Sequence, residues 1–172
     1  MTFEILIEDG RWSALDLETL AVQSCAAVLR CLDVAQEAEI SLLACDDTRI
    51  AALNADFRGK PAPTNVLSWP AEALAPDQPG ARPPPPRPDP DGALCLGDIA
   101  IAWETCHREA LDANKPLADH VSHLIVHGVL HLLGFDHVDD ADAAQMEALE
   151  IEILAGLGKP NPYIVSGGSQ RP

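Results

Sequence analysis

HLIVHGVLHLLGFDH, residues 123–137, is the most informative stretch of this chain. His127 and His131 are four residues apart, so on a helix both imidazoles lie on one face and can reach one metal ion at about 2.0–2.1 Å. Gly134 can end that helix in the left-handed conformation and reverse the chain, which returns His137 to the same ion. Three histidines leave the fourth tetrahedral position open to water or substrate, as in catalytic zinc sites. The spacing therefore predicts one zinc ion bound by these three histidines.

The other histidines fit this metal site less well. His123 shares a helical face with His127 and His131, but eight residues of helix rise about 12 Å, so the outer two cannot both reach one ion. We interpret His123 as a residue that supports a metal ligand or contacts substrate. His120 and His107 are interpreted as surface or packing histidines.

The same histidine spacing occurs in the metzincin proteases, where a glutamate beside the first histidine is the general base. Here that position is Gly128, so peptide hydrolysis by the usual route has no proton acceptor. Asp136, next to His137, either accepts a hydrogen bond from a ligand imidazole or is a turn residue. The sequence leaves both roles of Asp136 open, and it disfavours a zinc protease.

Outside this stretch, strand and helix patterns are mixed. Alternating or short apolar runs predict four strands, at residues 3–8, 40–44, 66–69 and 98–102. Helical spacing of apolar residues predicts helices at residues 13–32, 103–113, 116–133 and 141–157. A further helix is predicted between Asp47, as its N-cap, and Gly59, just past its end.

Residues 76–92 form a proline-rich segment, in which Pro83 to Pro86 are consecutive. Proline lacks a backbone N–H, so neither a helix nor a sheet ladder is expected there. We interpret the segment as a solvent-exposed loop insertion between two strands, with a polyproline recognition segment as the alternative. The expected organisation is one domain over residues 1–163, followed by a flexible tail at 164–172.

Composition sets further bounds. The 172 residues, 47% of them hydrophobic, suffice for one globular domain with its own core. The acidic start of the chain is unlike a secretory signal, and no stretch reaches membrane-spanning length without charge or proline, so a soluble, cytoplasmic protein that contacts no membrane is expected. The five cysteines also fit a reducing compartment, because they are odd in number and lack the C-x-x-C spacing of a thiolate metal site or redox pair.

The net charge of −16 repels nucleic acid at long range, so any RNA binding requires a local cationic patch. Much of the negative charge follows His137 in a run that we interpret as the solvated face of a helix. That run comprises Asp139, Asp140, Asp142, Glu147, Glu150 and Glu152.

Three blocks of sequence resemble the YbeY endoribonucleases, also called rRNA maturation factors. They are HGVLHLLGFDH at 127–137, LNADFRGK with PTNVLSWP at 53–70, and LGDI at 96–99. The family usually has tyrosine where this chain has Phe135 and reads PTDVLSFP in the second block, so Asn65 and Trp69 are also departures. MEALE at residues 146–150 and the closing residues 158–163 extend the resemblance over nearly the whole chain, whereas the proline-rich segment has no counterpart in shorter members.

The resemblance implies a single α+β domain, with a small mixed β-sheet packed against helices and a zinc helix like that of metzincins. It implies a zinc-dependent, single-strand-specific endoribonuclease in ribosomal RNA processing, namely 3′ end maturation of small-subunit 16S rRNA, and in ribosome quality control. The implied partners are single-stranded ribosomal RNA, the small ribosomal subunit and assembly factors. The alternative is a ribosome-assembly factor that zinc stabilises, with little direct catalysis.

The family's zinc histidines carry over to His127, His131 and His137, and its functionally important arginine carries over to Arg58. A guanidinium there could neutralise charge developing on a phosphate, and nearby Lys60 would add to the cationic patch that an acidic chain needs. The alternative for Arg58 is a helix-end residue that helps to cap carbonyl groups. No general base is evident, so the sequence leaves open whether water or the RNA 2′-hydroxyl attacks.

Overall fold

Strands and helices follow one another along the chain as the sequence patterns predict. The structure, a computed structural model, describes residues 1–34 and 37–164, so residues 165–172 of the expected tail lie outside the described part. The strands are β1 (Thr2–Ile7), β2 (Ala38–Cys45), β3 (Val66–Pro70) and β4 (Leu94–Ala102). The α-helices are α1 (Leu17–Cys31), α2 (Asp47–Arg58), α3 (Trp103–Asp112), α4 (Leu117–Leu132) and α5 (Asp140–Gly156). A short 3-10 helix, η1 (Gly10–Ala14), precedes α1.

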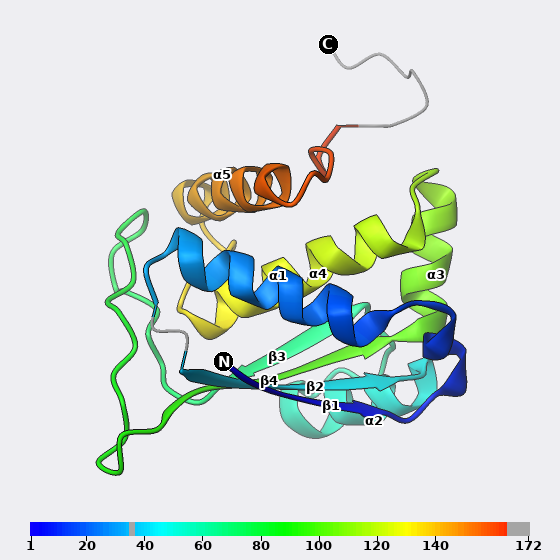
Figure 1. Cartoon of the computed structure of the whole chain (residues 1–172), viewed down its shortest axis with the longest axis horizontal. Helices are drawn as coiled ribbons and strands as arrows, with labels where there is room; N and C mark the ends of the chain where they lie inside the picture. The colour runs from blue at the N-terminus through cyan, green and yellow to red at the C-terminus, as the bar shows by residue number, and fades with distance from the viewer. Residues whose placement is uncertain (35–36, 165–172) are drawn as a thin grey trace.

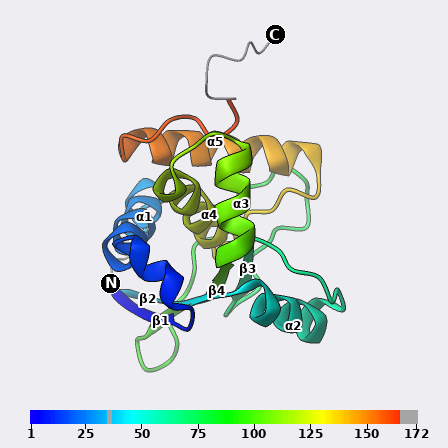
Figure 2. The same ribbon diagram turned by 90° about the vertical axis from the view of Figure 1, so that its right-hand side faces the viewer.

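The strands form one mixed sheet in the order β1-β2-β4-β3. β1, β2 and β4 are parallel, and β3 pairs antiparallel with β4. Figure 1 shows α1 and α4 over one face of the sheet, α5 beyond them, and α2 against the opposite face. The view in Figure 2 separates the same layers, with α2 beneath the end of the sheet that carries β4 and β3. The predicted α+β fold with a small mixed sheet is therefore confirmed.

α4 is the central helix of the main core. Ten of its residues are buried, and apolar side chains cover most of its circumference. Such a pattern is expected of a helix enclosed by other elements rather than of one that faces solvent. α4 contacts the sheet, α1, α3 and α5. The histidines that α4 carries are therefore held by the packing of the whole domain.

Two predicted helix starts need correction. The N-cap of α2 is Asp46, whose Oδ1 accepts the backbone N–H of Arg49 at 2.8 Å. Asp47 instead accepts the Thr105 hydroxyl and backbone N–H, which ties α2 to α3. The helix predicted over 13–32 is interrupted, because η1 buries Trp12 and donates the indole N–H of Trp12 to the Cys45 carbonyl before α1 begins.

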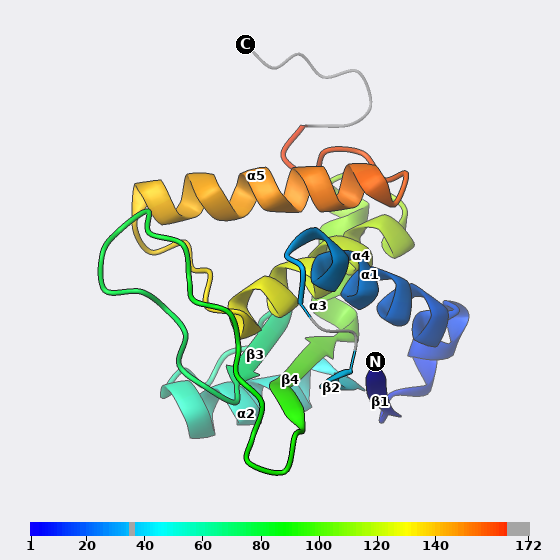
Figure 3. The same cartoon turned by 60° about the vertical axis from the view of Figure 1, so that its left-hand side comes forward.

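The connection between β3 and β4 contains the proline-rich residues 76–92 and has no helix or strand. It nevertheless contacts the rest of the domain, because the backbone N–H of Gly80 donates to Asp142 at the start of α5, at 2.7 Å. The Arg82 guanidinium lies 6.0 Å from the centroid of the Phe135 ring. Figure 3 shows this connection rising beside the start of α5. No helix among the described residues is both long and apolar enough to cross a membrane.

Candidate metal centre and its cleft

Three histidines converge at the end of α4. One ring nitrogen from each of His127, His131 and His137 can be chosen so that all lie within 4.8 Å of one another. The Nε2 atoms of His127 and His131 are 3.1 Å apart. Two nitrogens bound to one tetrahedral zinc at about 2.0–2.1 Å would be about 3.3 Å apart, so this pair is close to ligating geometry. The predicted set is thus brought together by the fold, and its donor chemistry fits a metal ion.

The third histidine depends on the turn after α4. Gly134 has a φ of +99°, a conformation that favours glycine, and a Cβ there would lie 2.8 Å from the backbone of Leu74. The backbone N–H of Phe135 donates to Leu130 at 3.0 Å and closes the reversal. This geometry returns His137 to the site, as the sequence indicated.

Burial and the neighbouring imidazoles control the charge of His131. Desolvation, followed by repulsion from His127 and His137, lowers the pKa of His131 to about 4. The ring is therefore neutral near pH 7. A neutral imidazole retains the lone pair that a metal ion requires.

Glu150 of α5 belongs to this site, and the prediction of a solvated helix face is wrong for it. Its side chain is fully buried and accepts the Nδ1–H of His127 at 2.7 Å. It also accepts from His123 Nε2 at 2.7 Å and from the Tyr163 hydroxyl. Burial raises the pKa of Glu150, but these hydrogen bonds outweigh burial and lower it to about 2. Glu150 is thus an ionised carboxylate inside the core.

A signal for Glu150 was present in the sequence. Apolar residues recur around it at helical spacing, and those at the buried face of α5 are Met146, Leu149, Ile153 and Leu154. Glu150 falls on that stripe, whereas Glu147 and Glu152 do not and are exposed. A charged residue on an apolar stripe indicates a paired buried charge rather than a solvated one.

The histidines form one side of a cleft of about 720 Å³. Its other side comes from the end of α2, the loop that follows it, and β3. The lining residues are Arg58, Lys60, Thr64, Asn65, Val66, Ser68, Pro70, Ala73, Leu74, Ala75, His127, His131, Gly134, Phe135, Asp136, His137 and Val138. The predicted cationic residues thus share a cleft with the predicted metal ligands.

Arg58 and Lys60 are exposed at the mouth of this cleft. Arg58 Nη2 donates to the Ser68 carbonyl of β3 at 3.0 Å, and its other guanidinium donors have no hydrogen-bond partner among the described residues. The Lys60 N–H donates to the Asn54 carbonyl at 3.2 Å, and the Asn54 side chain donates to Ala62 at 2.9 Å. The loop carrying Lys60 is therefore fixed to α2.

Two residues bear on proton transfer. A Cβ at Gly128 would lie 3.1 Å from Ile99 Cδ1, so a side chain at the position of the metzincin glutamate would point at β4. Asp136 accepts the backbone N–H of His137 at 2.7 Å, which is the turn role rather than a bond to an imidazole. Asp136 is the single carboxylate among the described residues that line the cleft.

The remaining histidines lie outside the cleft. His123 contacts Glu150 and Tyr163 rather than the cleft, a position that suits the support of a ligand better than contact with substrate. His120 is buried and pairs with Glu109 at 2.8 Å. His107 stacks on Trp103, with ring centroids 5.4 Å apart.

Comparison with known proteins finds relatives over nearly the whole chain. A family model described as Endoribonuclease YbeY matches residues 5–158. The chain belongs to the YbeY family. A member of the family from Dinoroseobacter shibae is 62% identical over 163 residues, covering 94% of this chain and 90% of that protein. Another, from Ruegeria pomeroyi, is 58% identical over 95% of this chain and 98% of that protein. Both are named Endoribonuclease YbeY.

A solved structure also resembles the fold. The solution structure of TM1509 from Thermotoga maritima has a TM-score of 0.54 and 20% identity, covering 98% of this chain and all of that one. At this identity the likeness concerns the fold alone. The match to the YbeY family model includes the three histidines, Arg58 and Glu150, but it ends before Tyr163.

Proposed function

We propose that the protein is a zinc-dependent endoribonuclease that cuts single-stranded ribosomal RNA. Its role would be 3′ end maturation of small-subunit 16S rRNA and ribosome quality control, in the cytoplasm, where ribosomal subunits and their assembly factors are found. The observation that carries the proposal is a three-histidine cluster that shares one cleft with Arg58 and Lys60. The family's name indicates the same class of reaction.

The choice of zinc rests on the donor set. Three imidazole nitrogens, one of them on a ring braced by a buried carboxylate, are typical of catalytic zinc. When bound, zinc supplies a Lewis acid that polarises a phosphoryl oxygen and lowers the pKa of bound water. The three ligand residues are all that this chain needs to provide, because a catalytic site keeps its fourth position open.

The residues opposite the histidines would bind the RNA backbone. Arg58 keeps guanidinium donors available beside β3 and can bind a phosphate through two of them. Lys60 adds a second cation two residues further along. In a chain with a net charge of −16, such a local pair is what allows a polyanion to approach. His123 is not proposed to contact RNA, because it faces Glu150 instead.

A second function is favoured by one observation. Asp136 is the single carboxylate among the described cleft residues, and its Oδ1 already accepts the backbone N–H of His137, so the cleft offers few groups that could act as a general base. A ribosome-assembly factor with a structural zinc would need no such base. Cleavage and subunit binding therefore have to be measured together.

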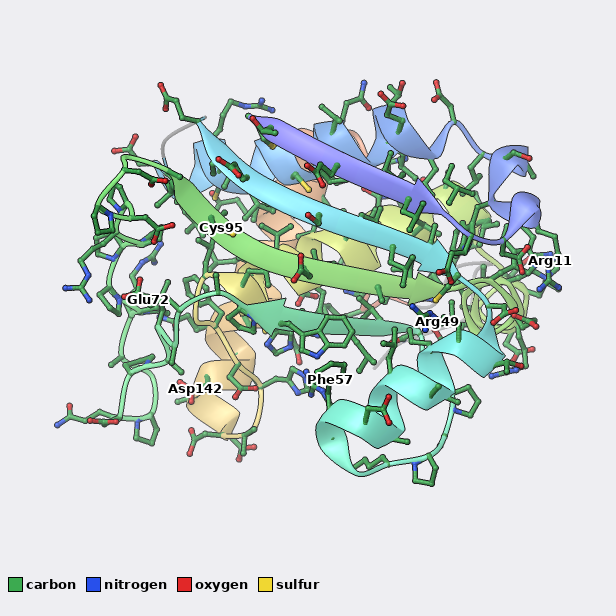
Figure 4. All side chains as sticks on the ribbon, turned by 90° about the horizontal axis from the view of Figure 1, so that it is seen from below. Arg11, Arg49, Phe57, Glu72, Cys95 and Asp142 are labelled. Atoms are coloured by element: carbon green, nitrogen blue, oxygen red, sulfur yellow. The ribbon has the colours of Figure 1, made fainter. Side chains whose placement is uncertain are left out.

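The decisive test is cleavage of single-stranded ribosomal RNA by chelator-treated protein before and after zinc is restored. We expect Arg58→Glu to abolish cleavage while zinc content and fold are retained. Arg49→Glu is the matched control, since Arg49 lies near the start of α2 (Figure 4) and does not line the cleft. If zinc-loaded wild type cuts no RNA but binds small ribosomal subunits, the assembly function replaces the nuclease. If Arg58→Glu cuts as fast as wild type, the role given to Arg58 is wrong.

A further inference from the structure

The buried carboxylate of Glu150 connects the metal site to the end of the described chain. Its Oε2 accepts the His127 Nδ1–H at 2.7 Å, while its Oε1 accepts from His123 Nε2 at 2.7 Å and from the Tyr163 hydroxyl. A buried carboxylate without partners would be strongly destabilising, so these three hydrogen bonds allow the charge to stay in the core.

The hydrogen bond to His127 determines how that ring can bind a metal. A neutral imidazole carries one proton, and the two Glu150 oxygens face three groups that can donate, so the proton of His127 lies on Nδ1, where Oε2 accepts it. The lone pair is then on Nε2, which faces Nε2 of His131 at 3.1 Å. A ring with its proton on Nε2 would have to lose that proton before it could bind an ion there.

The direction of the other bonds is equally fixed. His123 Nδ1 is buried and has no hydrogen-bond partner among the described residues, so the proton of His123 lies on Nε2, where Glu150 accepts it. Tyr163 can only donate to the carboxylate. With both donors occupying Oε1, Oε2 remains directed at His127.

Tyr163 is held in place by contacts of the segment after α5. Lys159 forms an ion pair with Asp119 of α4 at 3.1 Å, and Lys115 Nζ donates to the Pro162 carbonyl at 3.1 Å. The backbone N–H of Tyr163 donates to Asn161 Oδ1 at 2.8 Å. Figure 3 shows this segment turning back over the end of α5. The tyrosine thus reaches Glu150 from a segment that the YbeY family model does not cover.

We propose that Glu150 is a positioning residue for the metal site, which holds His127 in the tautomer that presents Nε2 to the ion. His123 and Tyr163 position Glu150 in turn, so the segment after α5 contributes to metal affinity. This inference rests on the proposed zinc site. It adds to that site a carboxylate and a tyrosine that contact neither metal nor substrate.

The test compares zinc affinity and imidazole tautomer in the full chain. Glu150→Gln presents an amide whose NH2 group must face one of the three donors, so we expect zinc affinity to fall roughly 10–100-fold, measured by competition with a chromophoric chelator. Tyr163→Phe removes one donor from a half-exposed ring, and we expect a loss of several-fold in the same direction. Glu147→Gln removes the same charge from an exposed position of α5 and should match wild type.

The second readout needs no metal. Long-range 1H–15N spectra of metal-free wild type should show His127 in the Nδ1–H tautomer, and Glu150→Gln should lose that uniform state. Unchanged zinc affinity together with an unchanged His127 tautomer in folded Glu150→Gln would overturn the inference. If Glu150→Gln does not fold, the test rests on Tyr163→Phe. A zinc affinity equal to that of wild type in Tyr163→Phe would overturn the proposal that Tyr163 contributes to metal affinity through Glu150. If wild type itself binds no zinc, the proposed function fails, while the tautomer still tests the role of Glu150.

Discussion

His127 and His131 lie on a helix enclosed by the sheet and three other helices, whereas Arg58 and Lys60 lie at the exposed end of α2, which buries only two of its residues. We call these sides the histidine wall (His127, His131 and His137) and the cationic wall (Arg58 and Lys60). Metal ligands must be fixed within fractions of an ångström, which core packing provides. Side chains that bind a phosphate backbone depend more on their positive charge and their length than on a rigid position. The two walls therefore respond differently to mutation.

The largest effect is expected on the histidine wall. His131→Ala removes a ligand, so zinc affinity should fall by more than the roughly 10–100-fold typical of losing a partner that orients a ligand. RNA cleavage should disappear with the zinc. Zinc content after dialysis and cleavage of single-stranded RNA measure both effects, and His107→Ala, outside the cleft, is the control. A variant that loses zinc yet cleaves normally would show that the metal is structural.

On the cationic wall, activity and metal binding should separate. Arg58→Ala is expected to reduce cleavage on the order of 10²–10³-fold, as for loss of one group that stabilises charge in a transition state. Zinc affinity should stay at the wild-type value because Arg58 contacts Ser68 and no histidine. Parallel measurement of kcat/KM and zinc content tests this separation. A fall in zinc content would mean that the two walls are coupled.

A substitution in the turn that joins α4 to His137 should lower the stability of the fold. Gly134→Ala places a Cβ 2.8 Å from the Leu74 backbone in a conformation with φ of +99°. Strain and overpacking together should cost about 2–4 kcal/mol of unfolding free energy. Denaturant unfolding of metal-free protein measures this loss. Gly156→Ala, at a helical position where a Cβ meets nothing within 4 Å, is the control and should be neutral or slightly stabilising, because alanine favours the helix.

A smaller effect is expected at Lys60. Lys60→Ala should weaken RNA binding by only a few-fold and reduce the slope of log affinity against log salt by about 1, as for one lost phosphate contact. Binding titrations at several salt concentrations measure the slope. An unchanged slope would remove Lys60 from the RNA path.

The sequence predicted the histidine wall better than the residues that support it, Glu150 and Tyr163. The spacing of His127, His131 and His137 around Gly134 is a local pattern, and local geometry alone brings those rings together. The role of Arg58 follows from resemblance alone, since nothing in its own spacing places it opposite a helix that begins at Leu117. Glu150 was misinterpreted because its partners come from α4 and from Tyr163, and such long-range contacts leave only a weak trace in a charged run.

The sheet illustrates the same limit. Strand positions follow from alternation of apolar residues, but the order β1-β2-β4-β3 and the reversed direction of β3 depend on pairing between distant segments. That order places β3 at the edge, between Arg58 and the histidines. The cleft is thus a consequence of topology, which no local pattern encodes.

The smallest expected effect concerns a hydrogen-bond network beside the cleft, outside both walls. Glu109 of α3 accepts from His120 of α4 at 2.8 Å and from Asn65, at the cleft, at 3.0 Å. The hydrogen bond from His120 lowers the pKa of Glu109, burial opposes it, and the bond from Asn65 lowers it further. A carboxyl whose pKa is lower in the folded state stabilises the protein above its unfolded pKa of about 4.3 and loses that contribution as pH falls through the folded value.

Glu109→Gln should therefore make the unfolding free energy of metal-free protein less dependent on pH below about 5. Glu109 is partly exposed, so the difference from wild type should stay below about 1 kcal/mol. Denaturant unfolding at a series of pH values, from neutral pH down through the pKa of Glu109, measures this difference. Glu147→Gln, at an exposed position, is the control. Cleavage at neutral pH should change little, because Glu109 contacts neither the histidine wall nor the cationic wall directly. A large loss of cleavage without loss of stability would instead show that Asn65, released from Glu109, sets the width of the cleft.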